Sequence, residues 1–163
     1  MSGAPILKGI HTTRNISLRP ASEADYGFAA ELYLESTKRL LPALGMWDEG
    51  RVVKRFRQAF KIEQVQVIRL DGADIGWMQV SEAAGRLHLH QFHIVPRFHN
   101  QGIGTCLIQA LLDRARGIGG SVGLNVIRGN RAISLYRRLG FRVVGGDAER
   151  LHMRWDAEPP GHH

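Results

Sequence analysis

The chain has 163 residues, of which 44% are hydrophobic and 23% charged, a balance typical of a globular domain and not of a disordered chain. Its net charge of +7 admits an anionic partner, but the arginines are scattered instead of forming a basic stripe with interleaved aromatics, which disfavours a nucleic-acid partner. No window approaches the roughly 18 consecutive apolar residues of a membrane span and the opening segment lacks the apolar core of a signal peptide, so we expect a cytoplasmic protein with no membrane partner.

The first half of the chain predicts a strand, two helices and a strand meander. A short strand ends at Pro20, because proline cannot donate the hydrogen bond that continues a ladder. Ser22 then begins one helix as its N-cap, and Asp48 begins a second helix with one apolar stripe. Over residues 64–95 the apolar period changes to two, and turn residues at 71–74 favour an antiparallel meander.

The second half predicts helices that alternate with strands. Helical spacing covers residues 102–117 and 130–140, and the expected strands are residues 121–127, 141–146 and 150–155. The last two of these strands are expected to form a hairpin. This order predicts a mixed α/β (α+β) fold in which helices lie on the faces of a sheet, in one domain over residues 1–158. Residues 159–163 are expected to be a disordered tail, a remnant of an expression tag.

The stretch VPRFHNQGIGTCL, residues 95–107, contains two glycines just before a helix, where backbone N–H groups and the helix dipole favour an anion. A mononucleotide P-loop needs a lysine directly after the last glycine, but Thr105 stands there. A dinucleotide loop needs a third glycine, but Leu107 stands there. Neither of these two phosphate loops fits the sequence.

The same stretch is similar to the acyl-CoA loop of the GNAT family of N-acetyltransferases, in which Gln/Arg-x-x-Gly-x-Gly/Ala opens a helix after a strand that ends in Val-x-Pro. Residues 124–141, LNVIRGNRAISLYRRLGF, resemble the later signature of the family: a strand, then Asn, then Tyr followed by Leu-Gly-Phe. The resemblance covers nearly the whole chain. It implies a mostly antiparallel sheet of roughly six or seven strands flanked by about four helices, with acetyl-CoA as cofactor.

The resemblance also implies which residues hold acetyl-CoA. The loop backbone would hold the diphosphate, and a bulge would turn the amides of the preceding strand toward the cofactor. The implied cofactor-binding residues are Phe92, His93, Ile94, His99, Asn100, Gln101, Gly102, Ile103, Gly104, Thr105, Asn130 and Tyr136. His99 departs from the family pattern, because this position is commonly Gln or Arg. Asn130 is equally compatible with a plain helix N-cap.

Two residues match catalytic positions of the family. Tyr136 matches the general acid, although an aromatic ring there could simply pack under a strand. His88 stands where members often have a glutamate base, and an imidazole with a pKa of about 6.5 can take a proton at neutral pH. Alternation places His90 on the same face as His88 until the bulge shifts the phase. Ligands at zinc spacing are not found, so no metal site is expected.

The activity that the resemblance implies is transfer of an acetyl group from acetyl-CoA to a primary amine of a small molecule or protein, by direct attack. The amine would enter near the first two helices, with Trp47 and His90 as substrate contacts, although Trp47 could merely pack its loop. A homodimer is compatible with the family. The alternative is a non-catalytic acyl-CoA-binding module, because a histidine replaces the glutamate. The sequence does not identify the amine.

Overall fold

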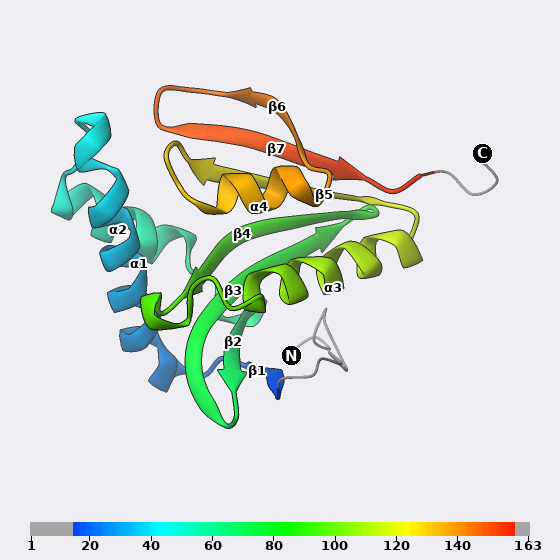
Figure 1. Cartoon of the computed structure of the whole chain (residues 1–163). Helices are drawn as coiled ribbons and strands as arrows, with labels where there is room; N and C mark the ends of the chain where they lie inside the picture. The colour runs from blue at the N-terminus through cyan, green and yellow to red at the C-terminus, as the bar shows by residue number, and fades with distance from the viewer. Residues whose placement is uncertain (1–14, 159–163) are drawn as a thin grey trace.

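The computed structural model describes residues 15–158, which form one mixed sheet with helices on both faces (Figure 1). The strands are β1 (Ile16–Pro20), β2 (Val65–Leu70), β3 (Ala73–Ala83), β4 (Arg86–Ile94), β5 (Ser121–Ile127), β6 (Arg142–Gly146) and β7 (Arg150–Asp156). The α-helices are α1 (Tyr26–Leu40), α2 (Glu49–Ala59), α3 (Ile103–Gly117) and α4 (Ala132–Arg138). Short 3-10 helices cover Glu23–Asp25, Pro42–Leu44, Ile62–Gln64 and Pro96–Phe98. The predicted order of strands and helices is confirmed.

Two expectations lie outside the described residues. They are the absence of a signal peptide in residues 1–14 and the tail at residues 159–163. Within the described range, no helix is both long and apolar enough to cross a membrane.

The sheet has the strand order β1-β2-β3-β4-β5-β7-β6. All neighbouring strands are antiparallel except β4 and β5, which are parallel. The predicted hairpin of β6 and β7 is present, and β7 also pairs with β5 along its whole length. The last strand, β7, therefore lies between β5 and β6 and connects the edge strand β6 to the rest of the sheet.

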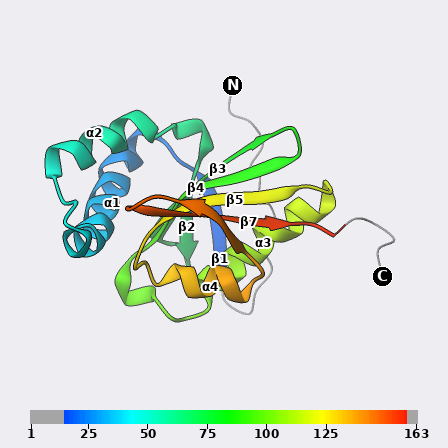
Figure 2. The same ribbon diagram turned by 90° about the horizontal axis from the view of Figure 1, so that it is seen from above.

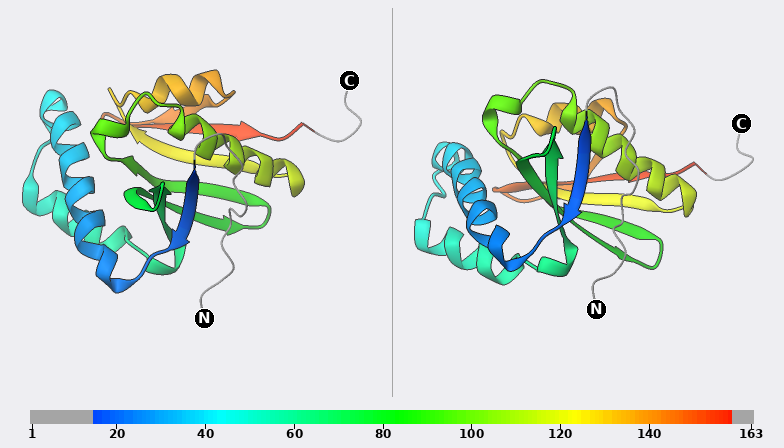
Figure 3. Two further views of the ribbon diagram at one scale, coloured as in Figure 1. Left: turned by 60° about the horizontal axis from the view of Figure 1, so that its bottom comes forward. Right: turned by 90° about the horizontal axis from the view of Figure 1, so that it is seen from below.

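The two faces of the sheet carry separate hydrophobic cores. On one face α3 packs its fully buried Leu107 and Leu111 onto the strands, beside α4. On the other face α2 packs Phe56 against Trp77 of β3, with their ring centroids 6.0 Å apart. Figure 2 shows the helix pairs on opposite sides of the strands, and both views of Figure 3 show α1 and α2 apart from α3. Since Asp48 accepts a hydrogen bond from the backbone N of Arg51 at 3.0 Å, the predicted cap of α2 is confirmed.

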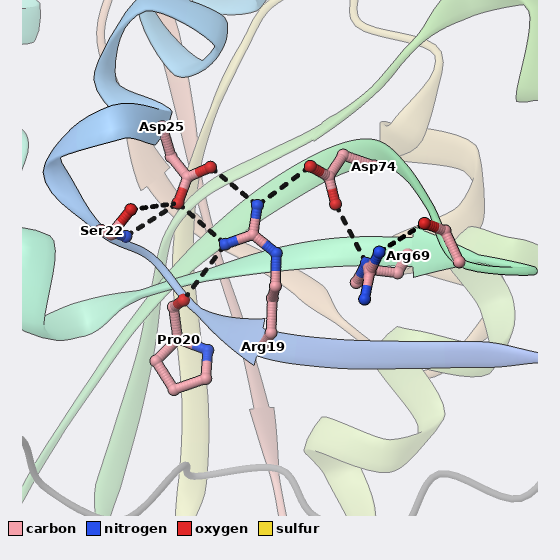
Figure 4. A network of polar contacts seen from close by, with 7 residues as sticks. Arg19, Pro20, Ser22, Asp25, Arg69 and Asp74 are labelled. Atoms are coloured by element: carbon pink, nitrogen blue, oxygen red, sulfur yellow. Dashed lines mark hydrogen bonds and ion pairs between the residues drawn. The ribbon is translucent and has the colours of Figure 1, made fainter.

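A polar network fastens β1 to the start of the first helical segment (Figure 4). Arg19 donates two hydrogen bonds to the carboxylate of Asp25, at 2.9 and 2.7 Å, and a third to Asp74 of β3 at 2.9 Å. Asp25 also accepts from the backbone N of Ser22 at 2.8 Å, and Arg69 of β2 donates to Asp74 at 3.1 Å. The hydrogen bonds from Arg19 lower the pKa of Asp25 from 3.8 to about 2.

Strands β4 and β5 separate halfway along β4. Their parallel pairing runs from Arg86 with Ser121 to Leu89 with Leu124 and stops there. At the same place β4 bulges against β3, since Gln79 pairs with Gln91 and Val80 pairs with Leu89, which leaves His90 as the extra residue. Figure 1 shows the two strands diverging toward their C-terminal ends. The last four residues of β4, beyond this point, are partly buried.

Candidate active site

A cavity of about 740 Å³, here called the large cavity, lies where the end of β4 meets the loop before α3. Its walls come from α1, the end of β4, the loop and first turn of α3, and α4. The lining residues are Ser36, Arg39, Leu40, Phe92, His93, Ile94, Phe98, His99, Asn100, Gly102, Ile103, Gly104, Thr105, Asn130, Arg131, Ala132, Ser134, Leu135 and Arg138. Most of the residues that sequence reasoning assigned to acetyl-CoA therefore lie around one cavity.

The loop before α3 lines the large cavity with Gly102 and Gly104, and because glycine has no side chain, their backbone atoms form that part of the wall. Asn100 and Gly102 have left-handed backbone angles, with φ of 61° and 79°, directly before the first turn of α3. At Gly104 a Cβ atom would lie 3.3 Å from Leu135 of α4 and 3.6 Å from Phe92 of β4. A larger residue there would push into the cavity wall, so the glycine keeps backbone and helix α4 close. The N-terminal turn of a helix at a cavity wall is suited to a phosphate, because its first N–H groups have no partner within the helix.

His99 has a structural partner that the sequence did not reveal. Its Nε2 donates a hydrogen bond of 2.6 Å to the backbone carbonyl of Ile94, the last residue of β4. The imidazole therefore fixes the start of the loop to the strand that precedes it. Gln101 is the predicted loop residue that does not line the large cavity; its side chain donates to the carbonyl of Arg97 at 3.0 Å.

Positive charge in the large cavity comes from Arg39, Arg131 and Arg138. Sequence reasoning missed all three as cavity residues. Arg131 and Arg138 are seven positions apart, which places them on one face of α4 and could have flagged them beside the asparagine of the motif. Arg39 carried no such signal, because it reaches the cavity from α1, far away in sequence. Guanidinium groups here are suited to phosphate oxygens.

A second cavity of about 60 Å³, here called the small cavity, lies in the gap between β4 and β5. Its lining comes from α1, β4, β5, α4 and β7. The lining residues are Tyr33, Ser36, Thr37, Leu40, Leu89, His90, Gln91, Phe92, His93, Leu124, Asn125, Val126, Ile127, Asn130, Tyr136 and Arg150. The large and small cavities share Ser36, Leu40, Phe92, His93 and Asn130. They therefore meet where β4 leaves β5.

Two of the three histidines of β4 line the small cavity. His90 lines it and its Nε2 lies 2.7 Å from Oγ of Ser81, whereas His88 lines neither cavity and lies beside the ring of His90, with centroids 4.5 Å apart. Burial lowers the pKa of both rings. His88, which was predicted to be the base, is thus separated from the small cavity by the ring of His90.

His93 lies at the junction of the two cavities. Its Nε2 is 2.7 Å from Oε1 of Gln91 and its Nδ1 is 3.2 Å from Oγ of Ser36. An amide oxygen only accepts, so Nε2 carries the hydrogen and Nδ1 accepts from the Ser36 hydroxyl. The ring is packed against Trp77 and Tyr33, and this burial lowers its pKa to about 4. His93 is therefore neutral at physiological pH.

Tyr136 and Asn130 both reach the small cavity from the α4 region. Tyr136 is 4% exposed, and burial raises the pKa of its hydroxyl above the usual range. Its ring centroid lies 5.5 Å from that of Phe141. Tyr136 therefore packs in the core, as one interpretation predicted, and also lines the small cavity. Asn130 accepts a hydrogen bond from the backbone N of Ala132 at 2.9 Å while lining both cavities. The N-cap of α4 is Arg131, so Asn130 lies one residue before the cap and not at it as predicted, although its side chain still accepts from the first residue of the helix.

Trp47 is brought to neither cavity. It is partly buried and packs against the hydrophobic cluster around α1 and α2. In the part of the chain that the structure describes, no group of three or more His, Cys, Asp or Glu side chains is placed to hold a metal ion.

The comparisons with known proteins agree with this geometry. A family model described as an acetyltransferase (GNAT) domain matches residues 61–143, from the end of α2 to the start of β6. The chain therefore belongs to the GNAT acetyltransferase family, and it is an acyl-CoA-dependent acetyltransferase with acetyl-CoA as cofactor. No curated protein is significantly similar to it in sequence.

Solved structures share the fold. The PaiA N-acetyltransferase of Thermoplasma acidophilum, in complex with coenzyme A, has a TM-score of 0.70 at 21% identity, over 87% of this chain and 99% of that one. The ribosomal-protein-S18-alanine N-acetyltransferase of Escherichia coli has a TM-score of 0.64 at 19% identity, over 90% and 96%. The N-acetylglutamate synthase of Neisseria gonorrhoeae, complexed with coenzyme A and N-acetyl-glutamate, has a TM-score of 0.64 at 14% identity, over 91% of this chain and 36% of that one. The mixed sheet with helices on both faces is thus the GNAT fold.

Proposed function

We propose that the protein transfers the acetyl group of acetyl-CoA directly to a primary amine that enters the small cavity. The observation that carries this proposal is the junction of the two cavities at residues shared by both, where β4 leaves β5. A cofactor arm in the large cavity and an amine in the small cavity would meet at this junction. Holding both reactants in one place supplies much of the rate enhancement of a group transfer.

The large cavity offers the cofactor two kinds of phosphate-binding group, the backbone amides of the loop and arginine side chains. The amides from Asn100 to Thr105 would hold the diphosphate of CoA. Arg131 and Arg138, which line the same cavity, are available for the 3′-phosphate of CoA. Acetyl-CoA supplies the acetyl group as an activated thioester. The backbone N of Val95 donates to Ile75 of β3, so by alternation the N–H groups of Phe92 and Ile94 point to the β5 side. Because β5 does not pair with β4 beyond Leu89, these groups have no strand partner there and can donate to a carbonyl oxygen that becomes negative.

Tyr136 is proposed as the general acid. Burial raises the pKa of its hydroxyl, so it keeps its proton at neutral pH and can give it to a departing thiolate. Its position on the wall of the small cavity supports this role.

His90 is proposed as the group that takes the proton from the amine, in place of the neighbouring His88. His90 lines the small cavity and its lowered pKa leaves the ring unprotonated at neutral pH. His93 lines the same cavity, but its two nitrogens are already engaged with Ser36 and Gln91, so we assign it to holding the junction in shape. His88 packs against the ring of His90 and would influence the reaction only through that ring.

The test is a panel of primary amines with detection of the free thiol of released CoA, beside calorimetric titration with acetyl-CoA. We expect binding of acetyl-CoA and amine-dependent thiol release. Binding without thiol release for any amine would identify a non-catalytic acyl-CoA-binding module instead. A cytoplasmic location and a homodimer stay predictions from the sequence and the family.

A further inference from the structure

Arg150 carries the permanent charge of the small cavity. Of the described residues that line this cavity, none is an aspartate or a glutamate. His90 and His93 line it as well, but burial lowers the pKa of both rings, so both are uncharged at neutral pH. The side chain that an amine acceptor meets as a charge is therefore a guanidinium.

Arg150 is held at the cavity wall with part of its guanidinium uncommitted. It is the first residue of β7 and pairs with Ile127 at the end of β5. Its side chain is 20% exposed, and its Nε lies 3.3 Å from Oε2 of Glu149. Its two terminal nitrogens make no hydrogen bond to any residue within 15–158. A guanidinium in this state can still bind a carboxylate through those nitrogens.

The surroundings of Arg150 add positive charge. Glu149 is shared with two arginines of α2, since Nη2 of Arg51 lies 3.3 Å and Nη1 of Arg55 lies 2.7 Å from its carboxylate oxygens. The turn between β6 and β7 also holds Asp147, whose carboxylate interacts with Arg150, so these three guanidinium groups stand beside two carboxylates. The three arginines around this turn therefore exceed its two carboxylates, which leaves a surplus of one positive charge beside the small cavity.

A second positive charge on the acceptor is unfavourable in such a place. A cationic group buried without a carboxylate partner loses its hydration without compensation, and it is repelled by the arginines. A carboxylate, in contrast, gains a charge-assisted hydrogen bond to Arg150. We propose that the amine acceptor carries a carboxylate close to its amine, as an amino acid does, and that Arg150 binds this carboxylate. This inference rests on the proposed transfer to an amine.

The size of the small cavity supports a compact acceptor. A volume of about 60 Å³ holds only a few groups the size of a water molecule. The amine and the carboxylate must then lie within a few bonds of one another if the amine is at the junction and the carboxylate is at Arg150. An α-amino acid has this spacing, whereas a long polyamine or an extended peptide would leave most of its length outside.

The experiment compares each of the common L-amino acids with its own carboxamide, with spermidine as a cationic amine. Initial rates are measured by thiol release for the wild-type protein, Arg150→Gln, Arg150→Lys and the matched control Arg55→Gln. The control breaks the closer ion pair to Glu149 but does not line the cavity, so it reports any structural effect of disturbing that carboxylate. Thermal melting establishes that each variant is folded.

We expect at least one amino acid to be acetylated with a kcat/KM about 30-fold above that of its carboxamide, since a charge-assisted hydrogen bond is lost with the carboxylate. Arg150→Gln should reduce that ratio to about 3-fold or less by lowering the rate with the amino acid, while Arg55→Gln leaves the ratio unchanged. Arg150→Lys should keep an intermediate ratio, because lysine retains the charge but not the planar donor pair.

Equal or faster acetylation of carboxamides or spermidine would overturn the inference about the acceptor and leave the proposed transfer intact. Absence of thiol release with every amine would instead contradict the proposed function. In that case calorimetric titration of the same amino acids into the CoA-saturated protein decides the inference. Binding that Arg150→Gln abolishes and Arg55→Gln retains supports it, and absence of binding overturns it.

Discussion

The two cavities of this protein are built in different ways. The large cavity is lined mainly by two continuous stretches, the loop that opens α3 and the start of α4, and we propose that backbone amides of the loop hold its ligand. The small cavity is lined by side chains of α1, β4, β5, α4 and β7, which meet only when the sheet is complete. A site of backbone groups tolerates side-chain changes, whereas each side chain of the small cavity can change the chemistry. The difference teaches that cofactor use and acceptor choice can vary independently in one fold.

Removal of the Tyr136 hydroxyl should give the largest difference between the effect on catalysis and the effect on cofactor binding. We expect Tyr136→Phe to lower kcat by about 100-fold, because a positioned proton donor is lost. The affinity for acetyl-CoA should change by no more than about 2-fold, since the ring still packs against Phe141. Thiol-release kinetics measure the first quantity and calorimetric titration the second. An unchanged kcat would remove Tyr136 from the reaction.

A side chain at Gly104 should break the large cavity and spare the small one. Since a Cβ atom there already lies 3.3 Å from Leu135, Gly104→Val should weaken acetyl-CoA binding by about 30-fold, or about 2 kcal/mol. The matched control is Gly117→Ala at the other end of α3, where a Cβ atom meets nothing within 4 Å. Calorimetry gives both dissociation constants. Equal affinities in the two variants would mean that the loop does not hold the cofactor.

The proton acceptor is tested by pH. His90 has a lowered pKa, so its neutral form prevails at pH 7, and activity should fall only as the pH drops below the usual histidine value of 6.5. His90→Gln should lower kcat/KM by about 10-fold at pH 7.5 and abolish the acidic limb of the profile. His88→Gln is the matched control on the same face of β4 and should keep that limb. A limb that vanishes in the His88 variant instead would return the base to His88.

The smallest effect on activity is expected from the polar network of Arg19 and Asp25, which touches neither cavity. Asp25→Asn should leave kcat unchanged and lower the free energy of unfolding by about 1 kcal/mol. The pKa of Asp25 is lowered from 3.8 to about 2, so the ionised carboxylate stabilises the fold above pH 3.8 and this contribution is lost as the pH falls toward 2. Urea unfolding at pH 7 and pH 2.5 measures both values. A difference between wild type and variant that is as large at pH 2.5 as at pH 7 would contradict the role of the ion pair.

More residues of the large cavity than of the small cavity could be predicted from the sequence, and the reason is physical. The loop from His99 to Thr105 is one contiguous pattern that opens a helix, so its place and its amides follow from local structure. The acceptor side depends on long-range pairing. Alternation placed His88 and His90 on one face, but only the point where β5 leaves β4, at Leu89, separates a histidine that lines the small cavity from one that does not.

Arg150 shows the same limit of sequence reasoning. The hairpin of β6 and β7 was predicted, yet the insertion of β7 beside β5 was not. That insertion is a property of the whole sheet, and it brings Arg150 to the small cavity. His99 was recognised as unusual, but its bond to the carbonyl of Ile94 depends on how the loop folds back on the strand.

The position of β7 has a consequence for synthesis on the ribosome. Since β7 lies between β5 and β6, a nascent chain that ends before Arg150 has β5 without its outer neighbour and β6 without any partner. The edge of β5 then stays open to other nascent chains for as long as translation takes to reach Asp156. The completed sheet, and with it the wall that carries Arg150, can form only after that strand has been made.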